Sequence, residues 1–430
     1  MRRRISLGGL ALVALGFWPV VGSSQTLDSG DSAWLLTATA LVLFMTLPGL
    51  ALFYGGLVRT KNVLSVLMQC FGICGFVSVI WVAFGYSLAF DDSAVPGLIG
   101  GLSKAWLTGI GVDSVTGSIP ETVFVMFQMT FAIITPALVV GGFAERMRFS
   151  AMLWFSVIWL IVVYLPVTHW VWSSSGWLAA MGFRDFAGGA VVHVNAGVAA
   201  LVAALVMGNR QGFPATPMPP HNLTMTVAGA SMLWVGWFGF NAGSALAAGG
   251  VAGMAMLVTH ISAAAGCVAW MSMEWLKFGK PSVLGIVTGM VAGLGTITPA
   301  SGFVGPLGAL LIGLSAGVIC FFATQVVKRK LKIDDSLDVF PVHGVGGFTG
   351  LLLTAVFSAT AGGLGLSAGQ TIGGQLLVQA VGALATAIWC AVATFAILKG
   401  IDLVIALRVS ADDERQGLDI SQHEERGYNL

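Results

Sequence analysis

The stretch Asp185-Phe186-Ala187-Gly188-Gly189-Ala190-Val191-Val192-His193-Val194-Asn195 is followed by an apolar run over 196–207. This run is apolar enough to cross a bilayer, where a polar side chain is costly unless it has a partner or a function. Asp185 is placed to cap a helix by accepting hydrogen bonds from the helix's first free amides. His193 has a donor and an acceptor to satisfy in an apolar medium. The stretch therefore predicts a membrane helix that carries a functional site. Packing of His193 against a backbone carbonyl is the structural alternative.

The composition of the whole chain places it among polytopic membrane proteins. Of its 430 residues, 57% are hydrophobic and only 9% are charged, and the mean hydropathy is +0.90. The chain is too apolar for a soluble domain. The net charge of +1 shows no basic excess, so we expect no nucleic-acid partner. The five cysteines lie in apolar segments without metal-ligand spacing. We therefore interpret them as packing residues, and we expect no metal and no cofactor.

The chain divides into three parts. Residues 1–25 begin with three arginines, continue with an apolar run and end in small residues, a layout that predicts a cleaved signal peptide. A retained first span is the alternative. Residues 26–407 form a transmembrane domain, and residues 408–430 form a cytoplasmic tail. About eleven helical spans are expected, because lipid leaves the backbone few other ways to pair. We place them at 33–57, 63–90, 122–143, 150–171, 186–207, 225–247, 250–275, 282–299, 304–327, 339–360 and 371–407.

The distribution of Lys and Arg predicts the orientation. With the mature N-terminus outside, nearly all basic residues of the mature chain fall on the cytoplasmic side, and the outer loops keep only Lys104 and Arg184. This asymmetry fits the positive-inside rule and an odd number of spans. The polar stretch 91–120 then forms an outer loop.

Histidines are the titratable residues that the sequence places within the spans. His193 lies eight residues beyond Asp185, and His343 lies five residues beyond Asp338. At helical rise these separations are about 12 Å and about 8 Å. Entering from opposite faces of a core about 30 Å thick, both histidines approach the middle. This mirrored placement, five spans apart, predicts an inverted repeat with a site between its halves.

Four motifs carry a resemblance to a known family. They are Ala51-Leu52-Phe53-Tyr54-Gly55-Gly56-Leu57-Val58-Arg59-Thr60-Lys61-Asn62, Asp185 to His193, Gly236-Trp237-Phe238-Gly239-Phe240-Asn241-Ala242-Gly243-Ser244, and Asp338-Val339-Phe340-Pro341-Val342-His343-Gly344. They resemble the ammonium transporter (Amt/Mep/Rh) family, bacterial Amt type, from about Ala33 into the tail. The resemblance implies an all-α fold of eleven transmembrane helices. Two inverted five-helix repeats plus a final helix would assemble as a homotrimer with one pore in each subunit.

The resemblance also implies a path for the substrate. An outer aromatic vestibule would recruit ammonium by cation–π contact and a hydroxyl, two stacked phenylalanines would close the pore, and two histidines would line the lumen and relay a proton. Ammonia fits an apolar pore, whereas ammonium is costly to desolvate, so the cation is expected to lose its proton. The implied residues are Phe131, Trp172 and Ser244 for recruitment, Phe131 and Phe240 for the gate, His193 and His343 for the relay, and Asp185, Gln128, Trp237 and Thr298 for support.

The tail is open to two interpretations. Its composition alone predicts a disordered, solvating end. The resemblance instead implies an ordered regulatory tail, packed against neighbouring subunits, that helps to dock a cytosolic PII-type nitrogen regulatory protein. The residues concerned are Glu414, Gly417, Asp419, His423 and Tyr428.

The function expected from the resemblance is transport of ammonium or ammonia, with methylammonium as an analogue, through a channel-like homotrimer. Its location would be the lipid of the bacterial inner membrane, in the service of nitrogen metabolism. The alternatives are a Rhesus-type channel for neutral ammonia or carbon dioxide and an ammonium sensor. No nucleophile elbow, metal motif or carboxylate pair indicates an enzyme.

Overall fold

The computed structural model describes residues 26–429, so the predicted signal peptide lies outside the described residues. Within this range, ten helical segments are long and apolar enough to cross a membrane, and one shorter apolar helix of 15 residues accompanies them. Together they account for the eleven predicted spans. The protein is therefore an all-helical, multi-pass membrane protein.

The first half of the chain contains five spans, some of which include a π-helical turn. The spans are α1 (Ser29–Phe44), η1 (Met45–Leu50) and α2 (Ala51–Leu57); η2 (Thr60–Asn62), α3 (Val63–Ile80), η3 (Trp81–Gly85) and α4 (Tyr86–Phe90); α5 (Glu121–Phe143); α6 (Phe149–Trp159), η5 (Leu160–Tyr164), α7 (Leu165–Trp172) and α8 (Trp177–Ala180); and η6 (Gly189–Val194) with α9 (Asn195–Met207). The segment between α4 and α5 holds two short hairpins and one 3₁₀ turn: β1 (Ser93–Val95) with β2 (Ile99–Gly100), η4 (Ala105–Leu107), and β3 (Val115–Thr116) with β4 (Ile119–Pro120).

The second half contains six spans and the tail. These are α10 (Leu223–Gly243); α11 (Gly250–Phe278); α12 (Val283–Ile297); α13 (Pro306–Gln325) with η7 (Val326–Lys330); η8 (Phe340–Gly344) with α14 (Val345–Ala359); α15 (Ile372–Asp402); and the tail helices α16 (Ala411–Gln416) and α17 (Leu418–His423).

Polar residues at the ends of the apolar segments set where several helices begin and end. Asn222, Ser282 and Thr371 each accept a hydrogen bond from the amide three residues ahead, which satisfies one free donor of the first turn. Gly279 ends α11 in the left-handed conformation, with φ of +78°. The span boundaries therefore follow from local capping as well as from hydrophobicity.

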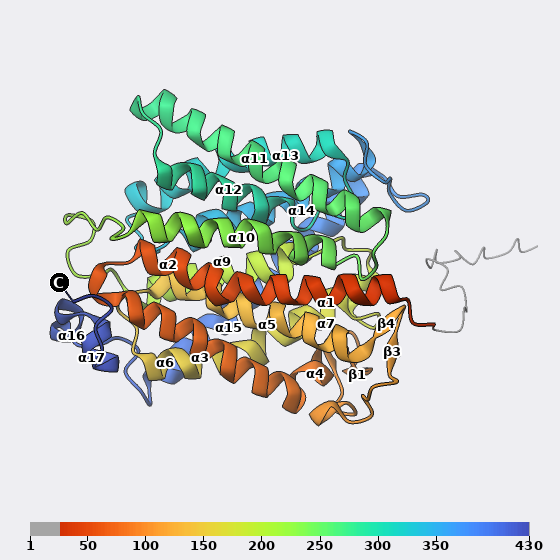
Figure 1. Cartoon of the computed structure of the whole chain (residues 1–430), viewed down its shortest axis with the longest axis horizontal. Helices are drawn as coiled ribbons and strands as arrows, with labels where there is room; N and C mark the ends of the chain where they lie inside the picture. The colour runs from red at the N-terminus through yellow and green to blue at the C-terminus, as the bar shows by residue number, and fades with distance from the viewer. Residues whose placement is uncertain (1–25, 430) are drawn as a thin grey trace, which may run out of the picture.

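The two ends of the helical bundle differ. The tail helices α16 and α17 lie at one end, here called the tail end, and the β3–β4 hairpin lies at the other (Figure 1). α11 and α13 pack together along one edge of the bundle (Figure 1).

The fifth and tenth spans approach each other closely in the interior. A Cβ added at Gly197, in α9, would lie 2.2 Å from the amide nitrogen of Gly344, at the end of η8. A Cβ at Gly347 would lie 2.8 Å from the Cβ of His193. Only glycine permits this backbone approach. As a result, the histidines of the two spans are brought side by side.

Candidate functional site

The two predicted histidines form a stacked pair in the middle of the bundle. Their Nδ1 atoms are 3.2 Å apart, their ring centroids are 5.2 Å apart, and the ring planes differ by 19°. His193 lies in η6 and His343 in η8, so both belong to π-helical turns, which are rare and often mark functional sites. At 3.2 Å one nitrogen must carry a proton and the other must accept it, so the tautomers of the two rings are coupled.

Two side chains fix the ring of His193. Trp237 stacks on it at a centroid distance of 5.4 Å, with an interplanar angle of 18°. Thr298 Oγ1 lies 3.3 Å from His193 Nε2 and accepts a hydrogen bond from Trp237 Nε1 at 3.0 Å. Because Thr298 Oγ1 also donates to the Leu294 carbonyl, its proton is engaged elsewhere. His193 therefore presents an Nε2–H to Thr298, which leaves its Nδ1 as the acceptor toward His343.

An aromatic cluster lies above the histidines, on the side away from the tail end. The rings of Phe131 and Phe240 are 4.3 Å apart, and the Phe240 ring lies 6.1 Å from that of His193. Both phenylalanines are almost fully buried. With no polar atom on either ring, this layer blocks a hydrated ion from reaching the histidines.

Trp172 lies at the outer edge of the phenylalanine pair. Its ring meets Phe131 edge-on, at 5.6 Å and 90°, and its Nε1 donates to the Asp185 carbonyl at 2.9 Å. Ser244 is half-buried and follows the last turn of α10, where its Oγ donates to the Phe240 carbonyl at 2.8 Å. With its proton engaged, the Ser244 oxygen keeps lone pairs that can accept.

Gln128 is the least well placed of the predicted residues. It lies one helical turn before Phe131 in α5, where its Oε1 is buried and has no hydrogen-bond partner among the described residues.

Asp185 has the predicted capping role. Its carboxylate accepts hydrogen bonds from the amides of Gly188, Ala190 and Val191 at 2.8, 2.7 and 3.3 Å, and from that of Gly189. It therefore holds the start of η6, four residues before His193, in a fixed orientation.

The pairing of Asp185 with Asp338 across the inverted repeat is wrong. Asp335, and not Asp338, is the counterpart, because its Oδ2 accepts from the amide of Phe340, five residues ahead, at 2.7 Å. Asp185 makes the same bond to Ala190, also five residues ahead. Each acid thus precedes its histidine by eight residues. Asp338 instead forms an ion pair with Lys328 at 2.7 Å. The symmetry of the two halves is consequently closer than the sequence motifs indicated.

Two cavities extend from the histidine pair toward the tail end. The inner one is lined by both histidines and by apolar side chains such as Ile134 and Leu138. The other one opens beside His343 and has a polar wall that includes Tyr54, Lys328 and Asp338. Sequence reasoning assigned no role to Tyr54 or Lys328. Tyr54 lies inside one of the four quoted motifs, and this was the only sign in the sequence that it belongs to the site.

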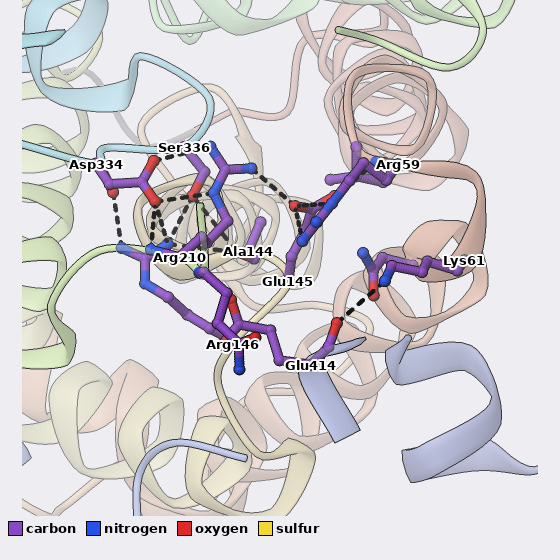
Figure 2. Close-up of polar contacts among 12 residues, drawn as sticks. Arg59, Lys61, Ala144, Glu145, Arg146, Arg210, Asp334, Ser336 and Glu414 are labelled. Atoms are coloured by element: carbon purple, nitrogen blue, oxygen red, sulfur yellow. Dashed lines mark hydrogen bonds and ion pairs between the residues drawn. The ribbon is translucent and has the colours of Figure 1, made fainter. Parts of the chain in front are cut away.

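A buried ionic cluster at the tail end adjoins this opening through Ser336 (Figure 2). Arg210 contacts Asp334 through Nη2 at 2.8 Å and Glu145 through Nη1 at 2.8 Å. Arg59 makes a second contact to Glu145 at 2.9 Å. Arg146 donates to Ser336 Oγ at 2.7 Å, and Ser336 lines the opening. The cluster therefore ties three loops of the tail end to the wall of the cavity.

The cluster shifts the pKa values of its members. Burial alone raises the pKa of Glu145, but the charges of Arg210 and Arg59 outweigh burial, so the net pKa is lowered. The pKa of Asp334 is lowered too, because hydrogen bonds and charge from Arg210 oppose its burial. Among the described residues, Asp335 forms no ion pair. Burial, and then the charge of Asp338, raise its pKa to about 7. Both acids that contact Arg210 are therefore held in the ionised form at neutral pH.

The tail is ordered against its own chain, contrary to the disordered interpretation of its composition. Glu414 accepts from the amide of Gln211 at 2.7 Å and pairs with Arg408 at 2.7 Å. Asp419 accepts from the amide of Ser65 at 2.8 Å. Gly417 packs against Lys61. The ring centroids of His423 and Phe149 are 5.0 Å apart, and the Tyr428 hydroxyl lies 3.0 Å from His221 Nε2.

Comparison with known proteins identifies the family. The model of the Ammonium Transporter Family matches residues 33–428. An ammonium transporter of Bacillus subtilis is 46% identical over 94% of this chain and 99% of its own length, and one of Aquifex aeolicus is 46% identical over 97% and 100%. The crystal structure of Saccharomyces cerevisiae Mep2 superimposes with a TM-score of 0.82 at 36% identity, covering 90% of this chain and 91% of that one. A structure described as a sensor Amt protein gives 0.85 at 29% identity, covering 92% and 98%. The chain belongs to the Ammonium Transporter Family.

Proposed function

We propose that this protein transports ammonium across the membrane by binding the cation, removing its proton and passing ammonia through an apolar lumen. The observation that carries the proposal is the stacked pair of His193 and His343 beneath the closed rings of Phe131 and Phe240. A titratable pair that no hydrated ion can reach directly is suited to move protons and a small neutral molecule, and unsuited to pass a solvated cation.

Recruitment takes place above the phenylalanine pair. Trp172 packs against the ring of Phe131, and Ser244, which follows the helix that carries Phe240, keeps an acceptor oxygen. An ammonium ion there gains a cation–π contact of about 0.5–2 kcal/mol together with a hydrogen bond to Ser244. The carbonyl of Asp185 already holds the Trp172 indole in place, so little ordering is needed when the cation binds.

Proton removal precedes entry into the lumen. Desolvating an ion in an apolar passage costs far more than desolvating ammonia. The proton moves to the imidazole pair, where the 3.2 Å contact between the Nδ1 atoms allows transfer from ring to ring. Ammonia then moves along the lumen past Ile134 and Leu138 toward the opening beside Asp338. His343 also lines this opening, where it releases the proton to water, and ammonia takes up a proton from water to become ammonium again.

The tail end faces the cytoplasm in this proposal. Arg59, Lys61, Arg146 and Arg210 lie together near Glu414 of the tail (Figure 2), as the positive-inside rule requires of the cytoplasmic side. The location is a bacterial inner membrane, since transporters of bacteria are among the relatives. We further propose a homotrimer with one pore per subunit, in keeping with the family resemblance.

The tail regulates the pore in this proposal. Five residues of the tail hold α16 and α17 against the tail end of the bundle, next to the ionic cluster. They are Glu414, Gly417, Asp419, His423 and Tyr428. A cytosolic PII-type regulator would contact this ordered surface and close the opening beside His343.

Sensing of ammonium is the second candidate function. The superposition on the solved structure described as a sensor Amt protein covers 98% of that protein's chain. In a sensor, ammonium binds at the same aromatic cluster, but its occupancy does not lead to flux. Vesicles distinguish the two functions, because binding without measurable uptake supports a sensor and rules out transport.

The test uses the full chain reconstituted into lipid vesicles. After an ammonium concentration jump, transport predicts a current and a change in internal pH that exceed those of empty vesicles, and an equal sodium jump should give neither. Variants Phe131→Ala and Phe240→Ala open the ring layer, so selectivity for ammonium over potassium should fall. A wild-type response equal to that of empty vesicles overturns the proposal.

A further inference from the structure

A pocket lies between the tail and the turn that precedes α3, and we call it the tail pocket. Its volume of about 300 Å³ is at the lower end of the range for small-molecule sites. Its lining comes from η2, from the two tail helices and from the segment after α17, namely Thr60, Lys61, Gln416, Asp419, Ile420 and residues 425–428. The two cavities beside the histidines share none of these residues. The tail pocket is therefore separate from the pore.

The lining of the tail pocket carries charges of both signs. Lys61 and Arg426 are basic. Asp419 and Glu425 are acidic, so the formal charge of the lining is zero. Asp419 is already engaged, because its Oδ1 accepts from the amide of Ser65 at 2.8 Å. Neither Glu425 nor Arg426 forms an ion pair within 4.0 Å in the part of the chain that the structure describes. One acid and one base of the pocket are thus free to contact an occupant.

Two other side chains of the lining are held in place by hydrogen bonds. Lys61 Nζ donates to the carbonyl of Glu414 at 3.2 Å (Figure 2). The Tyr428 hydroxyl lies 3.0 Å from Nε2 of His221, and His221 Nδ1 lies 2.8 Å from the carbonyl of Val58. Because a carbonyl can only accept, His221 carries its proton on Nδ1 and the Tyr428 hydroxyl donates to Nε2. This part of the pocket is formed before an occupant binds, which lowers the entropic cost of binding.

The free acid and the free base select the class of occupant. A simple anion would pair with Arg426 alone, and a simple cation would pair with Glu425 alone. A zwitterionic α-amino acid presents a carboxylate to Arg426 and an ammonium group to Glu425 within one small molecule. Gln416 adds an amide and Thr60 adds a hydroxyl, and both groups can donate and accept. These two groups suit a side chain that is polar and uncharged.

We propose that the tail pocket binds a free, polar α-amino acid, for which L-glutamine is the probe. Arg426 contacts its carboxylate and Glu425 its ammonium group. The bound molecule joins residues 425–428 to η2 and α16, so it stabilises the ordered form of the tail. Binding at this pocket does not depend on transport through the pore, and each can be measured without the other.

The size of the effect follows from the exposure of the two charged side chains. Glu425 and Arg426 are both exposed, so water screens each ion pair, and removal of one pair should weaken binding by up to about fivefold. We expect this loss of L-glutamine affinity in Arg426→Gln and again in Glu425→Gln. Glutaramate, which lacks the ammonium group, should bind the wild type about fivefold more weakly than L-glutamine. Its affinity should be unaffected by Glu425→Gln, because the contact that this variant removes is already missing.

The experiment titrates L-glutamine and glutaramate into the full chain in detergent by isothermal calorimetry. The matched controls are Glu424→Gln and Lys399→Gln, which remove one acid and one base of the same end that line no part of the tail pocket. Both controls should keep the wild-type affinity. Hydrogen exchange of the tail is measured in parallel, and saturating L-glutamine should slow the exchange of residues 418–428 in the wild type and in both controls.

Three results overturn the proposal. One is the absence of saturable binding of L-glutamine to the wild type up to about 10 mM, a range that covers weak sites for small molecules. Another is equal weakening in the pocket variants and in the controls, which indicates only general surface charge. The last is equal affinity of the wild type for glutaramate and L-glutamine, which indicates a site for anions and not for amino acids.

Discussion

Replacement of Trp172 by leucine tests the recruitment site. The substitution removes the ring that borders the space above Phe131, and also the indole Nε1 that donates to the Asp185 carbonyl. The layer formed by Phe131 and Phe240 remains, as does the histidine pair. We therefore expect the variant to bind ammonium less tightly and to keep an operational pore.

The magnitude follows from the two contacts that are lost. A cation–π contact is worth about 0.5–1 kcal/mol at an exposed site and about 2 kcal/mol when desolvated. Trp172 is half-buried, so about 1 kcal/mol is appropriate. At room temperature this energy corresponds to roughly a fivefold higher half-saturation concentration. Trp172→Phe keeps an aromatic face and should show an intermediate value.

The assay measures ammonium-driven current against concentration in vesicles. Trp389→Leu is the matched control, because Trp389 also donates its Nε1 to a backbone carbonyl, that of Val162, but lies on α15 away from the aromatic cluster. The control should keep the wild-type half-saturation. An unchanged half-saturation in Trp172→Leu, or an equal rise in both variants, refutes the assignment.

Three further predictions concern the tail end. Arg210→Met leaves Glu145 and Asp334 buried without their main partner, which should cost about 3–5 kcal/mol of folding free energy. The thermal midpoint in a scanning fluorescence measurement should fall by roughly 3–6 °C. An unchanged midpoint would contradict a stabilising role for the cluster. The pKa of both acids is lowered in the folded state, so the stability they contribute is present above about pH 4.5 and is lost as the pH falls through the folded values. The wild type should therefore destabilise more steeply below pH 4.5 than Arg210→Met, and equal slopes would argue against the linkage. Deletion after Arg408 removes the contacts of Glu414 and Asp419 and should impair transport and abolish membrane recruitment of a PII-type regulator in a co-sedimentation assay; full transport with normal recruitment would show that the tail is dispensable.

The spans and the histidine pair were predictable from the sequence because they depend on local physics. Apolar length fixes the helices, and a histidine in such a segment requires a partner. The motif around Asp185 predicted both the cap and the approach of His193 to the middle of the membrane. The eighth span was predicted at about the right place, but as α12 it is only 15 residues long.

The parts that were missed depend on contacts between distant segments. Asp338 was paired with Asp185 because it begins the motif that contains His343, whereas the capping acid is Asp335, which a single hydrogen bond to Phe340 reveals. The bonds from Arg210 to Asp334 and Glu145 join loops more than 60 residues apart. Such pairings leave no periodic pattern in the sequence. Composition alone also favoured disorder for the tail, because it cannot show that Asn62 and Ser65 supply partners for Leu418 and Asp419.

The central claim is that the histidine pair moves the proton taken from ammonium. The most direct measurement records uptake of labelled methylammonium and electrical current in the same vesicles, for the wild type and for His193→Val and His343→Val. We predict uptake with accompanying current in the wild type, and a loss of current of at least about tenfold in either variant at equal levels of folded protein, as expected for removal of a proton-transfer group. Ammonium-driven current that is unchanged in both variants would contradict the account.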